Sequence, residues 1–244
     1  MPDSVDAIAN ALAEIEAAAA SARRGDSRGR KDRDRKGGGP TFRPVRWLLI
    51  GVAAFLLPFW VLILGATIAA ETLDLGPWSS LAVAGVATAS LIAVYVWTVA
   101  RKLGSSPGSW IPKLSLAIVG AYCIYGLVFI SPQRLKDPEI GATYTSLHPV
   151  IRLSLSTLIL VDSGAVVTDA ARVPEDYAGM GLPVNERSLH FRQSDGFVYA
   201  VDLRTRGRPE WLTALTTLYM RSVGLSVLRH LGTADHLHVY LKPR

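Results

Sequence analysis

Three long apolar segments without a charged residue constrain this 244-residue chain more than any other feature of its sequence. They cover residues 47–70, 81–100 and 114–130. A helix needs about 20 apolar residues to cross the hydrocarbon core of a bilayer, and buried core helices rarely follow one another without any charge. The first segment also begins too late and runs too long for a signal peptide. We therefore predict three transmembrane α-helices within residues 47–131.

The distribution of Lys and Arg predicts how these helices are oriented. A dense group of basic residues lies between residues 23 and 46, the loop at 71–80 has none, and Arg101, Lys102 and Lys113 follow the second segment. Basic flanks stay in the cytoplasm, so we expect a multi-pass protein of the cytoplasmic (inner) membrane with a cytoplasmic N-terminus and a periplasmic or other extracytoplasmic C-terminal domain. The net charge of +6 then reflects topology and attraction to membrane lipid, and we expect no nucleic-acid partner.

Residues 1–46 are predicted to form a cytoplasmic region with two parts. Within residues 4–22, apolar side chains recur at spacings of three and four among alanines, which favours an amphipathic helix suited to self-association or to a partner. The stretch from Gly25 to Pro40 is charged and rich in glycine, and it cannot bury enough apolar surface to order itself. We interpret it as a flexible basic linker.

Residues 141–244 have the composition of an α+β domain with helices and a small antiparallel sheet. The segment 147–164 favours a helix, although its β-branched residues leave a strand open, and 165–172 reads as a short buried strand. A turn at Ser194–Gly196 separates two strand-like runs, 188–193 and 197–203, which predicts a hairpin. A helix should begin near Pro209, with Trp211, Leu212, Leu215, Leu218 and Tyr219 on one face, and two short strands near 226–228 and 236–241 should complete the domain.

The last predicted strand carries two histidines on one face. Side chains alternate along a strand, so Leu237 and Val239 face the core while His236 and His238 share the opposite face. Taken alone, this pattern fits an incidental pair of histidines as well as half of a metal site. The only cysteine, Cys123, lies in the third apolar segment and excludes both an intrachain disulfide and a cysteine-based zinc site.

The predicted hairpin decides whether His190 and Asp202 can join these histidines. A two-residue turn at Asp195–Gly196 would send them to opposite faces. A three-residue turn with Gly196 in the left-handed conformation would pair Gln193 with Phe197 and place them on the same face. Only the second geometry allows a shared metal ion.

The order of these residues resembles the LAS group of zinc peptidases, which includes D-alanyl-D-alanine carboxypeptidases, D,D-dipeptidases and peptidoglycan endopeptidases. The resemblance covers roughly the last hundred residues and rests on four segments: Thr168-Asp169-Ala170-Ala171-Arg172, Ser188-Leu189-His190, Gly196 with Ala200-Val201-Asp202, and Asp235-His236-Leu237-His238. It implies that His190, Asp202 and His238 bind Zn²⁺. The group usually has fewer residues between its first histidine and its aspartate than the eleven that separate His190 from Asp202.

The same resemblance assigns roles to the residues around the metal. Asp235 would be the general base, His236 would replace it in that role or stabilise the oxyanion, and Arg172 would bind a peptide carboxylate or the tetrahedral intermediate. Ser188 would contact the substrate or be a plain strand hydroxyl. Independently of the resemblance, Asp169 could orient Arg172 or cap a turn.

The resulting expectation is a membrane-anchored zinc metallopeptidase that hydrolyses peptidoglycan stem peptides. Two alternatives from other classes remain open. The C-terminal domain could bind peptidoglycan without cutting it, or the protein could be a membrane assembly module whose working part is the N-terminal helix.

Overall fold

A computed structural model describes residues 42–104, 108, 110–179, 181, 183–232 and 235–242 of the chain. The predicted amphipathic helix at 4–22 and the linker at 25–40 lie outside these residues. The chain divides into two compact units, Met1–Phe55 and Leu56–Arg244. The second unit contains every residue discussed below as part of the candidate site.

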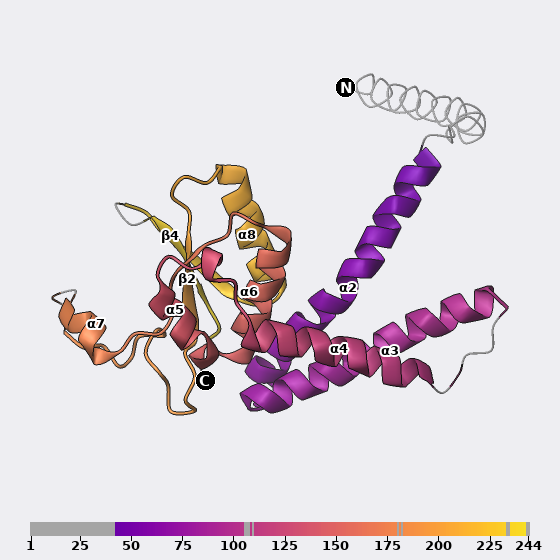
Figure 1. Ribbon diagram of the computed structural model, residues 1–244, viewed down its shortest axis with the longest axis horizontal. Coiled ribbons are helices and arrows are strands. Elements are labelled where there is room, and N and C mark those ends of the chain that lie inside the picture. The colour runs from indigo at the N-terminus through magenta and orange to yellow at the C-terminus, as the bar shows by residue number, and fades with distance from the viewer. Residues whose placement is uncertain are drawn as a thin grey trace, which may run out of the picture. The chain divides into compact units, whose positions relative to one another are not determined.

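The three apolar segments form long helices, as predicted. These are α2 (Phe42–Thr72), α3 (Pro77–Lys102) and α4 (Trp110–Val128), and each is long and apolar enough to cross a membrane (Figure 1). Pro77 occupies the first turn of α3, where its missing N–H costs nothing, and Arg101 and Lys102 lie in the last turn, where cations interact favourably with the helix dipole. Helix α2 continues through Pro58 without a break.

The C-terminal part of the chain has the predicted α+β architecture. Its elements are η1 (Pro132–Arg134), α5 (Pro138–Thr143), η2 (Tyr144–Ser146), α6 (Pro149–Val161), β1 (Val167–Asp169), α7 (Pro174–Gly179), β2 (Ala200–Arg204), α8 (Glu210–Ser222), β3 (Ser226–His230) and β4 (His236–Tyr240). The four strands form an antiparallel sheet in the order β1-β2-β4-β3. Helices α6 and α8 lie together beside this sheet (Figure 1).

Helix α6 resolves the choice between helix and strand for residues 147–164. Its first residue is Pro149, and the ring Nδ1 of His148 accepts a hydrogen bond from the backbone N–H of Val150 over 3.3 Å, which caps the first turn. Most of α6 is buried, including Ile151, Leu153 and Leu155. A helix that is covered on several sides carries apolar residues all round, so its sequence lacks the polar face of a surface helix.

The domain is fastened to the long helices by hydrogen bonds to their backbone. The hydroxyl of Tyr144 donates to the carbonyl of Gly126 over 2.6 Å, and Nη1 of the buried Arg152 donates to the carbonyl of Leu127 over 2.7 Å. These carbonyls lie in the last turn of α4, where they have no partner within the helix. These hydrogen bonds join the last turn of α4 to the α+β domain, and both belong to the compact unit Leu56–Arg244.

The predicted hairpin is only partly correct. The three-residue turn is present: the N–H of Gln193 donates to the carbonyl of Phe197 over 2.8 Å, and Gly196 has a φ of +85°. Residues 188–193, however, form turns and not a strand. The antiparallel partners of β2 are β1 and β4. Strand β1, about 30 residues before β2 in the chain, thus pairs with β2 in place of the predicted partner strand at 188–193.

Candidate metal centre

Asp202 and His238 are brought together by the register of the sheet. They lie directly opposite each other on β2 and β4, so their side chains project from the same face. Their neighbours Val201 and Val239 point to the other face and are fully buried in the core. The alternation predicted for the last strand is therefore confirmed, and the apolar half of each strand fixes the position of the polar half.

His190 reaches the same face from a loop. Its backbone carbonyl accepts a hydrogen bond from the N–H of Arg172 over 2.8 Å, and the carbonyl of Leu189 accepts one from the N–H of Tyr199 over 2.9 Å. The ring Nδ1 of His190 lies 2.6 Å from the carbonyl oxygen of Ala170, so Nδ1 must carry the proton and donate it. That bond leaves the lone pair of Nε2 directed at the cluster in the neutral ring, an arrangement typical of a histidine that binds a metal.

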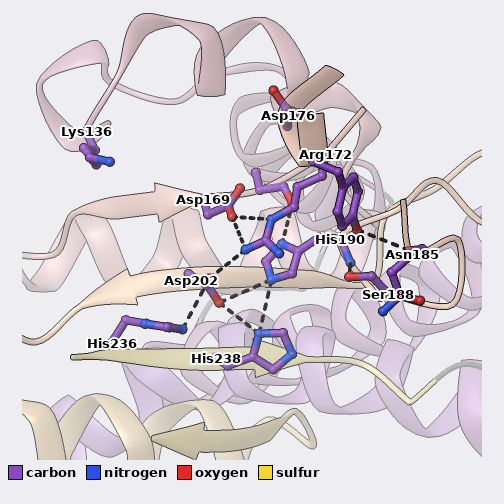
Figure 2. Close-up of polar contacts among 12 residues, drawn as sticks. Lys136, Asp169, Arg172, Asp176, Asn185, Ser188, His190, Asp202, His236 and His238 are labelled. Atoms are coloured by element: carbon purple, nitrogen blue, oxygen red, sulfur yellow. Dashed lines mark hydrogen bonds and ion pairs between the residues drawn. The ribbon is translucent and has the colours of Figure 1, made fainter. Parts of the chain in front are cut away.

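Three potential ligand atoms converge at one point (Figure 2). Nδ1 of His238 lies 2.9 Å from Oδ1 of Asp202, Nε2 of His190 lies 3.3 Å from the same oxygen, and the two ring nitrogens are 3.2 Å apart. A tetrahedral ion with ligands at about 2.0–2.1 Å separates its ligand atoms by about 3.3–3.4 Å. The three residues that the sequence resemblance selected can therefore hold a metal ion together.

The histidines of the cluster stabilise the negative charge of Asp202. Burial alone would raise the pKa of Asp202, but the hydrogen bonds with His190 and His238 hold it well below its usual range. The second carboxylate oxygen, Oδ2, faces Nε2 of His236 at 3.4 Å and Nη2 of Arg172 at 3.9 Å. Asp202 is thus an ionised, almost fully buried carboxylate, which is the form that binds a metal.

Arg172 lies at the edge of the cluster and is held by Asp169. Its Nε donates to Oδ2 of Asp169 over 2.7 Å, and its Nη2 lies 2.5 Å from the same oxygen. Asp169 sits opposite Asp202 in the register of β1 and β2, on the same face as the three ligands. The pairing of Asp169 with Arg172 is therefore confirmed, and it fixes the guanidinium group beside the candidate metal position (Figure 2).

Ser188 contributes to the placement of His190. Its Oγ accepts a hydrogen bond from the backbone N–H of His190 over 3.3 Å. This contact gives Ser188 a local role in the loop, and its predicted contact with substrate remains a prediction.

Asp235 forms an ion pair with Arg229. Its two oxygens accept hydrogen bonds from Nε and Nη2 of Arg229 over 3.1 and 2.8 Å, and Arg229 also binds Glu210 of α8. The pairing with Arg229, with help from Thr205, lowers the pKa of Asp235 to about 2. A general base is most effective with a pKa near the working pH. The role predicted for Asp235 remains a prediction, but this arrangement does not bring it to the three ligands.

His230 and the carbonyl of Ala170 complete the surroundings of the site. His230 lies opposite His236 in the sheet, and the two rings stack with centroids 4.9 Å apart. Sequence reasoning missed Ala170, because a backbone carbonyl has no sequence signature. The contact of His230 with His236 follows from the pairing of β3 with β4, which the sequence did not predict.

No protein-family model matches the chain, and neither curated proteins nor solved structures show a match to it. The resemblance to the LAS group therefore depends on the residue pattern itself. The long spacing between His190 and Asp202 is accommodated by the turn at Gln193–Phe197, which returns the chain to β2.

Metal affinity is expected to fall as the pH drops toward and below about 6.5, the ordinary pKa of histidine. A metal binds the deprotonated ligands, and Asp202 stays ionised because its pKa is already low. Burial lowers the pKa of His190, but the hydrogen bond and charge of Asp202 outweigh it and raise that pKa, so protons compete with the metal for this ring. Zinc competition titrations at a series of pH values measure the effect. An affinity that stays constant down to about pH 4, where ordinary carboxyl groups titrate, would contradict it.

Proposed function

We propose that the C-terminal domain is a zinc-dependent peptidase that hydrolyses peptidoglycan stem peptides, as a D-alanyl-D-alanine carboxypeptidase or an endopeptidase. The observation that carries the proposal is the convergence of Nε2 of His190, Oδ1 of Asp202 and Nδ1 of His238 within 3.3 Å of one another. Two imidazoles and one carboxylate are a common ligand set of catalytic zinc. Zinc bound to three protein ligands supplies Lewis acidity and a water molecule of lowered pKa.

The residues around the ligands suit an anionic peptide substrate. Arg172 has a partly exposed side chain, and its guanidinium group can present two parallel N–H donors to a carboxylate or to a developing oxyanion. Asp169 holds that group in place and offsets part of its charge. Free peptide carboxylates are present on stem peptides, so Arg172 supports both the substrate class and the orientation of the scissile amide.

His236 is the residue that we propose as proton acceptor. It shares the face of His238, its Nε2 lies 3.4 Å from Oδ2 of Asp202, and its side chain is more exposed than the three ligands. An imidazole can take a proton from the attacking water and return it to the leaving amine. Asp235 would have to leave Arg229 before it could do the same.

Kinetics of two variants distinguish these two bases. His236→Gln should lower kcat about 10²–10⁴-fold, the usual contribution of general acid–base catalysis, with a smaller change in KM. Asp235→Asn should change kcat much less, because the lost partner is Arg229 and not the substrate. Rates of release of D-alanine from a synthetic stem pentapeptide measure both effects. A larger loss of kcat in Asp235→Asn than in His236→Gln would show that Asp235, and not His236, is the general base.

The proposed location follows from the apolar helices and the basic flank. We propose that the α+β domain faces the periplasm or the cell exterior, where peptidoglycan lies. Modification of a single cysteine at Glu175 of α7, in a Cys123→Ser background, by a membrane-impermeant reagent in intact cells tests this orientation. Protection of that cysteine until the cells are lysed would contradict it.

A single assay tests the function. The full chain, purified in detergent, should cleave muropeptides, lose this activity when treated with a chelator and regain it with zinc. The full chain is required because α6 packs against α4, and a domain cut near residue 141 would lose that cover. A folded protein that holds zinc and binds muropeptides without cutting them would contradict the enzymatic proposal.

The second candidate is a non-catalytic peptidoglycan-binding domain. The observation that favours it is the ion pair of Asp235 with Arg229, which leaves the predicted base bound to a cation. This alternative predicts that His238→Ala leaves muropeptide binding unchanged and that a chelator does not affect it.

A further inference from the structure

Helix α8 directs its large apolar side chains away from the protein. Trp211, Leu215 and Leu218 are 63%, 52% and 65% exposed, and their spacing of four and three places them on one face of the helix. The residues that α8 buries against the domain include Thr213, Thr216 and Met220. This distribution reverses that of a helix packed on a soluble domain, where the largest apolar residues face the core. We refer to Trp211, Leu215 and Leu218 as the α8 apolar stripe.

The end of α8 is attached to one of the long apolar helices. Nε1 of Trp60 in α2 donates to the carbonyl of Ser222 over 2.9 Å, and Oγ1 of Thr67 donates to the carbonyl of Val223 over 2.8 Å. Trp60 is itself exposed on the side of α2. Trp60 and Thr67 both lie within the apolar span Val45–Thr72. The C-terminal end of α8 therefore lies beside a part of α2 that is apolar enough to cross a membrane.

Helix α6 adds apolar surface beside α8. The hydroxyl of Tyr219 in α8 donates to the carbonyl of Ser154 in α6 over 3.1 Å, and Arg208, just before α8, pairs with Asp162, just after α6, so the two helices approach each other at these points. At the end of α6, Leu160 and Val161 are exposed. These exposed residues of α6 and the α8 apolar stripe belong to one compact unit, Leu56–Arg244, which also contains α2 from Leu56 onward.

We propose that the α8 apolar stripe lies on the lipid bilayer that α2, α3 and α4 cross, with α8 as an interfacial helix. The stripe is continuous with the exposed apolar surface of α2 through the contact of Trp60 with Ser222, and this continuity favours lipid over a separate protein partner. An interfacial helix buries one apolar face at the level of the headgroups and keeps polar residues on its other faces. The proposal rests on the long helices and is independent of the metal centre.

Such a contact would fix the position of the metal centre relative to the membrane. The stripe is on the outer side of α8, whereas His190, Asp202 and His238 lie on the sheet face that Val201 and Val239 do not occupy. Because α8 and the sheet belong to one body, a bound α8 would hold the candidate site at a constant height above the bilayer surface.

Spin labels on the full chain in phospholipid nanodiscs test the proposal. In a Cys123→Ser background, a nitroxide at Leu215→Cys or Leu218→Cys should collide more often with dissolved oxygen, which partitions into lipid, than with a water-soluble nickel chelate. A nitroxide at the matched control Glu175→Cys, on exposed α7, should show the opposite order. Both α8 positions are exposed, so neither change should disturb folding.

Two results would overturn the proposal. Greater access of the nickel chelate at both α8 positions would show that the stripe faces water. Low access of both reagents, together with a dipolar coupling between labels on two chains, would show that a second copy of the protein covers the stripe. Activity of the metal centre plays no part in this readout, so failure here leaves the proposed function untouched.

Discussion

Asp202→Asn is expected to remove metal binding and hydrolytic activity together. The substitution keeps the size of the side chain but removes the negative charge that contacts both His190 and His238. Loss of an outer-sphere partner typically weakens metal affinity about 10–100-fold, so loss of a charged ligand should weaken it by more than about 100-fold. Zinc content per chain, measured after gel filtration of the full protein, and the rate of muropeptide cleavage record the two effects.

A matched control separates this result from a general effect of removing a carboxylate. Asp195 lies in the turn of the same domain, where it accepts hydrogen bonds from the N–H of Phe197 and the hydroxyl of Tyr199. Asp195→Asn should keep the zinc content of the unmodified protein. Zinc retained at one ion per chain in Asp202→Asn would show that Asp202 is not a ligand.

Gly224→Ala is expected to produce the largest loss of stability among simple substitutions in the junction of α8 with α2. Gly224 has a φ of +92°, and a Cβ atom there would lie 2.6 Å from Cγ2 and 3.1 Å from Cβ of Thr67. A non-glycine residue in a disfavoured backbone conformation costs about 1–3 kcal/mol, and overpacking costs about 1–3 kcal/mol more. Denaturant unfolding of the full chain in detergent, followed by Trp fluorescence, measures the change in the free energy of unfolding.

Gly207 provides the control for the backbone contribution. It has a φ of +79°, and among the described residues no atom lies within 4 Å of the position that a Cβ would take, so Gly207→Ala should show the conformational cost alone. Adding Thr67→Ser to Gly224→Ala removes Cγ2 but keeps the hydroxyl that donates to Val223, and it should recover part of the loss. Equal losses in Gly224→Ala and Gly207→Ala would contradict the steric contact with α2.

The sequence predicted those parts of the structure that depend on local periodicity. The uncharged apolar segments predicted helices α2, α3 and α4. The alternation along the last strand predicted that His236 and His238 lie on one face. The sequence also predicted a turn at Ser194–Gly196 but left its length of two or three residues open, and the structure has the three-residue form with Gly196 at positive φ. These features are set by residues close together in the chain.

The remaining features depend on contacts between distant residues. The pairing of β1 with β2 joins strands about 30 residues apart, and a short strand does not encode its partner. His190 therefore reaches Asp202 from a loop and not from the predicted strand. The engagement of Asp235 by Arg229 likewise depends on α8, which supplies Glu210 as the second anion. The outward face of α8 could not be predicted, since helical periodicity identifies an apolar face but not what covers it.

Binding of one zinc ion by His190, Asp202 and His238 is the claim on which the proposed function depends. X-ray absorption spectroscopy at the zinc edge, on the purified full chain loaded with one equivalent of zinc, tests it most directly. We expect two imidazole nitrogens and one carboxylate oxygen at about 2.0–2.2 Å, with one imidazole missing from the spectrum of His238→Ala. A zinc environment that is unchanged in His238→Ala, or a folded chain that does not retain zinc, would contradict it.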